Sequence, residues 1–297
     1  MIYLSHFEFP GRETEYNFTM NQKRTCYDTV YPFLVLSEHQ LRELDFEPVT
    51  ILYGGNGSGK TTALNVIAEK LGLERDTLYN RTNFFEEYTR LCSCLGKETE
   101  RGKRRIPRMP KGSRIITSDD VFDFMLNLRS INDGIDRKRE ELLDDYLDTK
   151  YSQFTMRSIE DYEQLKKVCS VRSNTQSKYI RRNLMDNVRE HSNGESAFLY
   201  FTDKIKENGL YLLDEPENSL SPAKQQELLK FLEDSARFFC CQFIIATHSP
   251  FLLSMRGAKI YDMDEEVVDV KRWTELENVR TYYDFFKKYE NEFQQFP

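Results

Sequence analysis

Apolar residues cluster in short runs that predict an α/β protein. Each run has the composition of a strand, and polar turns separate it from the next. The runs lie at Met1–Phe9, Val30–Leu36, Val49–Tyr53, Arg114–Thr117, Leu210–Leu213 and Cys241–Ala246. The first three precede a glycine-rich segment and predict a small antiparallel β region at the N-terminus.

Helical spacing accounts for most of the remaining chain. A helix is expected from Ala63 to Leu71, and another is expected to open at Val121, with Ser118 as its N-cap. The charged stretch from Ile131 to Val188 carries one apolar stripe that includes Ile131, Ile135, Leu142 and Tyr146. Heptads are not sustained there, so the stripe predicts a compact helical insertion and not a long coiled-coil arm.

Aromatic residues recur at helical spacing in the tail, Val279–Phe296. They are Tyr282, Tyr283, Phe285, Phe286, Tyr289 and Phe293. Such a face either docks onto its own domain or forms a partner surface, and both interpretations stay open.

The glycine-rich segment at residues 54–62 reads G-x4-G-K-T between an expected strand and an expected helix. In that context, successive backbone N–H groups form an anion-binding nest at the positive end of the helix. The spacing predicts that Lys60 reaches the β- and γ-phosphates and that the Thr61 hydroxyl joins a Mg²⁺ shell. The chain is therefore expected to bind a nucleoside triphosphate through Gly55, Asn56, Gly57, Ser58, Gly59, Lys60, Thr61 and Thr62. Tyr27 and Tyr31 either stack on its base or pack internally.

Polar residues also follow two later strands. Asp214 and Glu215 end the run that starts at Leu210, where one carboxylate can hold Mg²⁺ and the next can polarise the attacking water. His248 follows the run that ends at Ala246, so we expect it to contact the γ-phosphate.

The segment His191–Glu195 is a second candidate phosphate contact. Ser192 and Glu195 have the spacing of a capping box that opens a helix. A capped helix start that carries Gly194 is itself an anion site, and it can meet phosphate from another molecule.

Composition limits the class of protein. Hydrophobic residues make up 39% and charged residues 31%, the formal net charge is −7, and the pI is near 5.4. This balance argues against a uniformly basic surface for nucleic acid. No apolar run approaches the length of a membrane span, and the N-terminus lacks a basic start, so a cytoplasmic protein is expected. The cysteines are expected to be reduced and not to bind zinc.

One local segment is strongly basic. Residues 97–114 carry eight basic residues against two glutamates. Prolines and glycines there predict a loop. The loop either contacts the phosphate backbone of a nucleic acid or is a solvated surface, and the two interpretations weigh equally.

In their order and intervals, these motifs resemble the ATP-binding-cassette class of ATPases. Within it, the chain is similar to the DNA-maintenance group: the heads of structural-maintenance-of-chromosomes proteins, double-strand-break repair ATPases, RecF and OLD-type ATPases. The likeness is greatest to small bacterial AAA-type ATPases, some carried in anti-phage defence loci. The sequence departs from the class pattern at Asn193, where the signature usually has glycine, and it lacks the usual Q-loop glutamine. Asp119 or Asp120 either replaces that glutamine or caps a helix.

The resemblance implies a fold, a reaction and a set of roles. It implies an ABC-type P-loop fold at 1–71 and 189–297, with a mostly parallel sheet, and a helical insertion at 72–188. It implies ATP and Mg²⁺ as cofactors, with Thr62 near the α-phosphate. The catalytic residues would be Lys60, Glu215 as general base and His248 as γ-phosphate sensor, and the metal would be held by Thr61 and Asp214. Ser192 and Gly194 would contact the γ-phosphate across a homodimer.

The same resemblance implies a cycle of ATP binding and hydrolysis that drives switching in a nucleic-acid-related or anti-phage complex. An alternative is that ATP gates a separate toxin or nuclease, because no nuclease constellation is visible in the chain. A subunit of a membrane transporter is a less favoured alternative, since the charge density of 119–190 does not suit an apolar groove for coupling helices.

Overall fold

The computed structural model describes residues 1–23, 26–27, 29–96, 108–154, 161–187 and 193–294. They form two compact units, Met1–Phe122 with Asn193–Pro297 and, separately, Asp123–Ser192. The expected boundary at residue 72 is therefore wrong. Residues 72–122 belong to the first unit because Phe84, Phe85 and Tyr88 are fully buried in its hydrophobic core.

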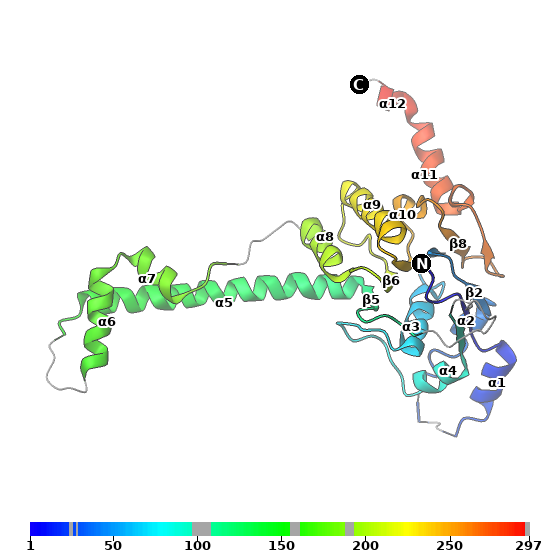
Figure 1. Cartoon of the computed structure of the whole chain (residues 1–297). Helices are drawn as coiled ribbons and strands as arrows, with labels where there is room; N and C mark the ends of the chain where they lie inside the picture. The colour runs from blue at the N-terminus through cyan, green and yellow to red at the C-terminus, as the bar shows by residue number, and fades with distance from the viewer. Residues whose placement is uncertain (24–25, 28, 97–107, 155–160, 188–192, 295–297) are drawn as a thin grey trace. The chain divides into compact units, whose positions relative to one another are not determined.

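A mostly parallel sheet organises the first unit, as the sequence predicts (Figure 1). In the described residues, its strand order is β5-β6-β7-β3-β8-β9, and only the β8–β9 pair is antiparallel. Strand β7 lies between β3 and β6, so the residues that follow it lie between those that follow its two neighbours. The strands are β3 (Val49–Tyr53), β5 (Arg114–Thr117), β6 (Leu210–Asp214), β7 (Gln242–Ala246), β8 (Lys259–Asp262) and β9 (Asp269–Val270).

Alternation along the strands gives the sheet two buried faces. Leu210 and Leu212 of β6, with Ile244 of β7, share one core with Ala63 and Leu64 of helix α3 (Lys60–Leu71). The residues between them in each strand point to the opposite face. Helix α9 (Pro222–Phe238) packs against β7, and helices α4 (Phe85–Leu91) and α8 (Asn193–Lys204) lie in the same unit. Because both faces are covered, these strands are continuous apolar runs.

The N-terminal antiparallel region is confirmed, but its composition differs from the prediction. The sheet pairs β1 (His6–Glu8) with β2 (Glu43–Asp45) and β4 (Ser93–Leu95). The predicted strand at Val30–Leu36 is wrong, because turns and helix α2 (Val35–Glu38) occupy it, and helix α1 (Arg12–Met20) was not predicted. Phe33 and Leu36 are apolar because the core of the first unit buries them, not because they form a strand.

A buried glutamate fixes this region. Glu15 is fully buried, and its carboxylate accepts hydrogen bonds from the Leu34 backbone N–H, the Ser37 hydroxyl and the Tyr88 hydroxyl. Burial raises the pKa of Glu15. Leu34 and Ser37 belong to α2 and its N-cap, and Tyr88 belongs to α4, so this one side chain of α1 joins three helices.

Glu15→Ala is expected to lower the free energy of unfolding by about 2–4 kcal/mol, because it leaves three donors without their acceptor. Urea denaturation measures the change. Glu13→Ala, on the same helix but exposed, is the matched control and should change stability by less than about 0.5 kcal/mol. Equal effects of the two substitutions would contradict the role given to Glu15.

The second unit is helical, as expected for an insertion. Helix α5 (Ser118–Tyr151) begins in the first unit and continues into the second, followed by α6 (Tyr162–Ser173) and α7 (Gln176–Asn183). Tyr146, Val171 and Tyr179 form a small core against which Leu142 packs. Of the predicted stripe, Ile131 is exposed.

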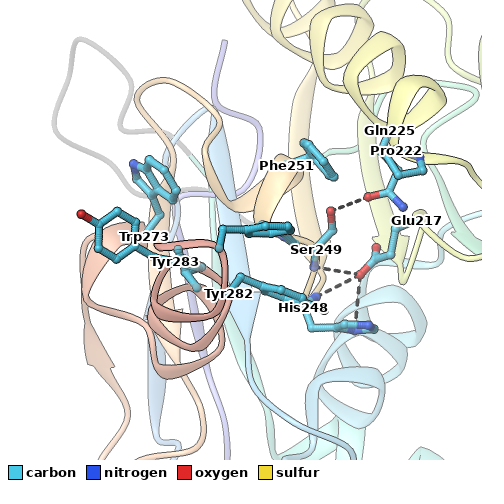
Figure 2. A pocket seen from close by; sticks show the side chains of 12 residues that line it. Glu217, Pro222, Gln225, His248, Ser249, Phe251, Trp273, Tyr282 and Tyr283 are labelled. Carbon is cyan, nitrogen blue, oxygen red and sulfur yellow. Dashed lines mark hydrogen bonds and ion pairs between the residues drawn. The ribbon is translucent and has the colours of Figure 1, made fainter. Parts of the chain in front are cut away.

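The C-terminal part begins with α10 (Pro250–Leu253) and a 3₁₀ helix (Trp273–Glu275), followed by α11 (Glu277–Lys288) and α12 (Glu290–Gln294). The aromatic residues of α11 do not dock fully onto the domain. Tyr282, Tyr283, Phe285 and Phe286 remain about half exposed. All of them except Phe285 line a hollow that His248 also lines (Figure 2). Among the helices of the described residues, none combines the length and the apolar character needed to cross a bilayer.

Candidate functional site

The P-loop, residues 54–62, curls around the side chain of its own Lys60. Gly59 caps α3 with a φ of 87°, a left-handed conformation that favours glycine. At Gly54, a Cβ would lie 2.5 Å from the Ser58 hydroxyl, so only glycine fits there. The Lys60 ammonium is buried and donates to the Gly54 and Gly55 carbonyls, at 2.6 and 2.7 Å.

A hollow of about 310 Å³ opens over this loop. Most of the predicted phosphate-binding residues line it, as do Glu215 and Val35. The P-loop residues in its lining are Asn56, Gly57, Ser58, Gly59, Lys60, Thr61 and Thr62. The backbone N–H of Gly55 is instead taken by the Asp264 carboxylate, at 2.8 and 2.9 Å.

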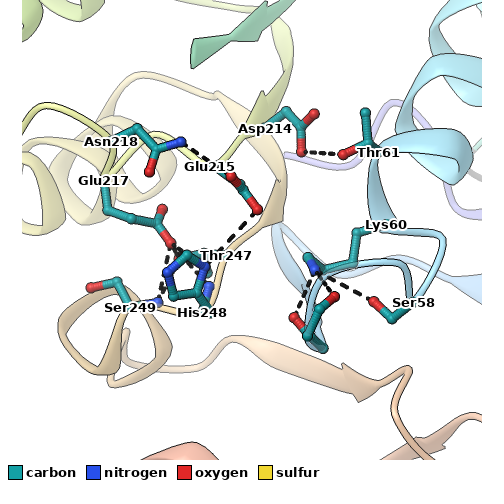
Figure 3. A network of polar contacts seen from close by, with 12 residues as sticks. Ser58, Lys60, Thr61, Asp214, Glu215, Glu217, Asn218, Thr247, His248 and Ser249 are labelled. Atoms are coloured by element: carbon teal, nitrogen blue, oxygen red, sulfur yellow. Dashed lines mark hydrogen bonds and ion pairs between the residues drawn. The ribbon is translucent and has the colours of Figure 1, made fainter.

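Asp214, at the end of β6, meets the start of α3. The Thr61 hydroxyl donates to Asp214 Oδ1 at 3.1 Å (Figure 3). Burial raises the pKa of Asp214 to about 6, a shift that the neighbouring Glu215 increases and the Thr61 hydrogen bond opposes. A buried carboxylate beside a threonine hydroxyl is the kind of oxygen pair that Mg²⁺ takes together with substrate phosphates. The residues present therefore fit the predicted ion.

Glu215 follows with its backbone in the left-handed region, at a φ of 47°. Non-glycine residues rarely adopt this conformation, and it is associated with functional sites. Asn218 donates to Glu215 Oε2 at 3.1 Å, and His248 Nδ1 lies 4.0 Å from Glu215 Oε1 (Figure 3). The structure thus gathers Lys60, Thr61, Asp214, Glu215 and His248 at one edge of the sheet.

Glu217 is the main polar residue here that sequence reasoning missed. Its Oε1 accepts from the Thr247 hydroxyl at 2.7 Å and from the backbone N–H groups of His248 and Ser249. It also lies 3.4 Å from His248 Nδ1. One buried carboxylate therefore holds the whole loop that carries His248. The signal available in the sequence was a second acid two residues after Glu215.

Arg75 and Asp264 were also missed. Arg75 is close enough to Asp214 for that carboxylate to affect its pKa, which burial lowers, and its Nη1 is buried without a hydrogen-bond partner. Asp264 follows β8 at the same edge of the sheet as Asp214. Its position after an apolar strand is a signal that could have identified it.

The signature segment is described only in part. Ser192, with His191, lies outside the described residues, and α8 begins at Asn193. Gly194 is not in the lining of the P-loop hollow; a Cβ added to it would lie 3.5 Å from the Ser219 carbonyl oxygen. Within one chain, Gly194 is thus beside the turn that follows the acidic pair.

Three other expectations have definite outcomes. Tyr27 packs edge-on against Phe84, and Tyr31 donates to the Thr62 hydroxyl, so neither lines the hollow. The Asp120 carboxylate accepts from the Thr117 backbone N–H and hydroxyl and from Thr77, which is a capping role. Helix α5 includes Ser118, which makes Thr117, not Ser118, its N-cap.

Most of the basic segment, residues 97–107, lies outside the described residues. Within the rest, Arg114 is paired with Glu74 and Asp76, at 3.2 and 3.4 Å, and is therefore not free for a nucleic-acid phosphate. The cysteines are all free thiols, with Cys92 and Cys241 buried.

Comparison with known proteins agrees with this architecture. Residues 113–254 match the model of a family described as "AAA domain, putative AbiEii toxin, Type IV TA system". No curated protein matches the chain. The strand order and the P-loop at the start of α3 define an ABC-type P-loop ATPase fold.

Solved structures with related folds include SMC heads and a transporter cassette. An Smc head domain from Pyrococcus furiosus, bound to the C-terminal domain of ScpA, is 13% identical over 91% of this chain and 96% of that one, with a TM-score of 0.43. The SMC head domain from Thermotoga maritima is 14% identical over 77% and 92%, with a TM-score of 0.37. A nucleotide-free cassette of an ABC transporter is 14% identical over 82% and 87%, with a TM-score of 0.39.

The raised pKa of Asp214 predicts how stability depends on pH without metal and nucleotide. A carboxyl group whose folded pKa exceeds its ordinary value of 3.8 favours folding below that value, and it loses this contribution as the pH rises through about 6. Asp214→Asn should therefore raise the free energy of unfolding at pH 7–8, by up to about 3 kcal/mol. The substitution should also make the free energy of unfolding less dependent on pH between pH 4 and 6.

Urea denaturation at several pH values measures both effects. Asp203→Asn, which changes an exposed aspartate, is the control and should leave the curve unchanged. A wild-type-like curve for Asp214→Asn would show that the carboxylate is not desolvated in solution.

Proposed function

We propose that this chain binds and hydrolyses ATP with Mg²⁺, and that two copies close head to tail over two nucleotides. One observation carries the proposal: the Thr61 hydroxyl contacts the buried Asp214 carboxylate at the mouth of a P-loop hollow that Glu215 also lines. A glycine turn with a purely structural role would not need a buried acid beside it.

The residues of the site would have separate roles in phosphoryl transfer. Lys60 and the P-loop N–H groups would hold the phosphates, and Thr61 with Asp214 would hold the ion, which neutralises charge that develops on the phosphates. Glu215 would take the proton of the attacking water. Lys60 already lies at the loop's own carbonyls, so its ammonium needs only a short side-chain movement to reach a phosphate.

The head-to-tail dimer is supported by where Gly194 lies. Gly194 is beside the turn at Ser219 and outside the hollow over its own P-loop. A helix start placed in this way can serve a phosphate that belongs to a second copy. Ser192 would contribute its hydroxyl to the same contact.

The cycle of ATP binding and hydrolysis is proposed to act on a partner molecule. The description of the matched family names a toxin–antitoxin system, which supports a role in defence. That the effector is a separate protein is proposed because no nuclease constellation is visible in the sequence. Binding of nucleic acid through residues 97–107 is the other proposal, supported by their charge.

Glu215→Gln should lower the ATPase turnover about 100-fold or more while ATP still binds, because it removes the base and keeps the shape of the side chain. Turnover is measured by phosphate release and binding by equilibrium dialysis. Glu207→Gln is the matched control, since Glu207 precedes β6 and so lies at the opposite end of the strand. Turnover of Glu215→Gln within a few-fold of wild type would remove Glu215 from the reaction.

Mixing two inactive variants tests the dimer. Lys60→Ala disables a P-loop, and Gly194→Asp would place a negative charge against the partner's phosphate, while its Cβ meets only ordinary van der Waals contacts. In a head-to-tail dimer, the mixture keeps one intact site in each mixed pair. Its activity should recover to about a quarter of the wild-type value. Gly194→Ala, which adds no charge, is the control. A mixture no more active than its components would show that each site is complete within one chain.

A further inference from the structure

A second hollow, of about 570 Å³, adjoins residues 247–249, the loop that carries His248 and is called the switch loop below, and is separate from the hollow over the P-loop. His248 and Ser249 border it on the side of the site (Figure 2). Much of the rest of its lining is aromatic and comes from α10, the 3₁₀ helix and α11. The aromatic residues are Phe251, Trp273, Tyr282, Tyr283 and Phe286.

Glu217 supplies the buried charge of this hollow. The residue is 6% exposed, and its Oε1 is saturated by the donors of the switch loop. Its Oε2 is buried without a hydrogen-bond partner in the described part of the chain. A carboxylate oxygen without a donor is costly in an apolar environment, so a ligand that brings a donor to it gains more than it would at the surface. Because this oxygen is itself buried, the side chains around it must shift before a ligand in the hollow can reach it.

The aromatic surface extends past the hollow. Along α11 and α12, Phe285 and Phe293 are also more than half exposed, and a neighbouring hollow of about 420 Å³ includes Phe293. A helix the length of α11 spans roughly 18 Å, which is longer than a small metabolite and typical of contact with a polypeptide. Exposed aromatic residues gathered on one element mark a protein interface.

We propose that a partner polypeptide packs on α11 and inserts an arginine side chain into this hollow, where its guanidinium donates to Glu217 Oε2. Arginine suits the site better than lysine, because its planar group stacks on aromatic rings and presents several donors in one plane. Glu217 also holds the loop of His248. The partner would therefore act on the ATPase site through a single carboxylate. The link to ATPase rests on the proposed function, but the binding itself does not.

The only tryptophan of the sequence, Trp273, lines the hollow and reports its occupancy. N-acetyl-arginine amide, added without nucleotide, should change the Trp273 fluorescence in a saturable way. The uncharged citrulline analogue should bind at least about tenfold more weakly. Glu217→Gln should weaken binding of the arginine amide by a similar factor. Glu290→Gln, which changes an exposed acid in the neighbouring hollow, should leave this binding unchanged.

Tyr282→Ala is a second variant, because Glu217→Gln also removes support from the switch loop. It removes part of the aromatic lining and leaves the hydrogen bonds of the loop in place. It too should weaken binding of the arginine amide. No saturable response in folded wild-type protein, equal binding of citrulline, or no effect of either variant would overturn the proposal. Because no nucleotide is present, failure of the ATPase model would leave this result unchanged.

A second experiment tests whether the arginine belongs to a polypeptide. A peptide with one arginine flanked by leucines should bind at least about tenfold more tightly than the arginine amide. Phe293→Ser, outside the hollow of Trp273, should remove that gain and leave binding of the amide unchanged. A peptide that binds no more tightly than the amide would reject a polypeptide partner in favour of a free guanidinium compound.

Discussion

Parallel pairing brings the carboxyl ends of three strands to one level, and the chemistry of the site depends on this register. Leu52 of β3 pairs with Ala246 of β7, which in turn pairs with Asp214 of β6. The residues that follow each strand therefore meet: the P-loop, the loop of His248 and Glu215. The hydrogen bond from Thr61 to Asp214 then joins the start of α3, which follows β3, to the end of β6. Segments far apart in sequence become one site because the strands are parallel.

This arrangement concentrates unfavourable electrostatics where the ligand would bind. Asp214 is desolvated. Among the residues that the structure describes, Glu217 Oε2 finds no donor and Arg75 Nη1 finds no acceptor. Buried polar atoms without partners are rare in native proteins, and each one destabilises the fold. Their gathering around the P-loop and the switch loop is what a site shaped for charged ligands would have.

The sequence predicted those parts of the fold that local chemistry dictates. β3, β6 and β7 are buried on both faces, and their apolar runs predicted these strands. The glycines and Lys60 gave the P-loop, since few other turns need that pattern. These signals lie within a few residues of one another.

What the sequence could not predict depends on contacts between distant residues. Val30–Leu36 has strand-like composition, yet Glu15 and the core of the first unit hold it in turns and a short helix. The division of the chain at residue 123 depends on which core buries Phe84 and Phe85. The role of Glu217 appears only when Thr247 and Ser249 are seen beside it. Tertiary context decides in each of these cases.

The left-handed backbone at Glu215 has a consequence for how this position evolves. A non-glycine residue there costs about 1–2 kcal/mol, which glycine would avoid. A library sorted only for thermal tolerance should therefore drift to glycine or asparagine at residue 215 and lose the carboxylate. Keeping the glutamate requires a selection for turnover, which sorting for thermal tolerance alone does not apply.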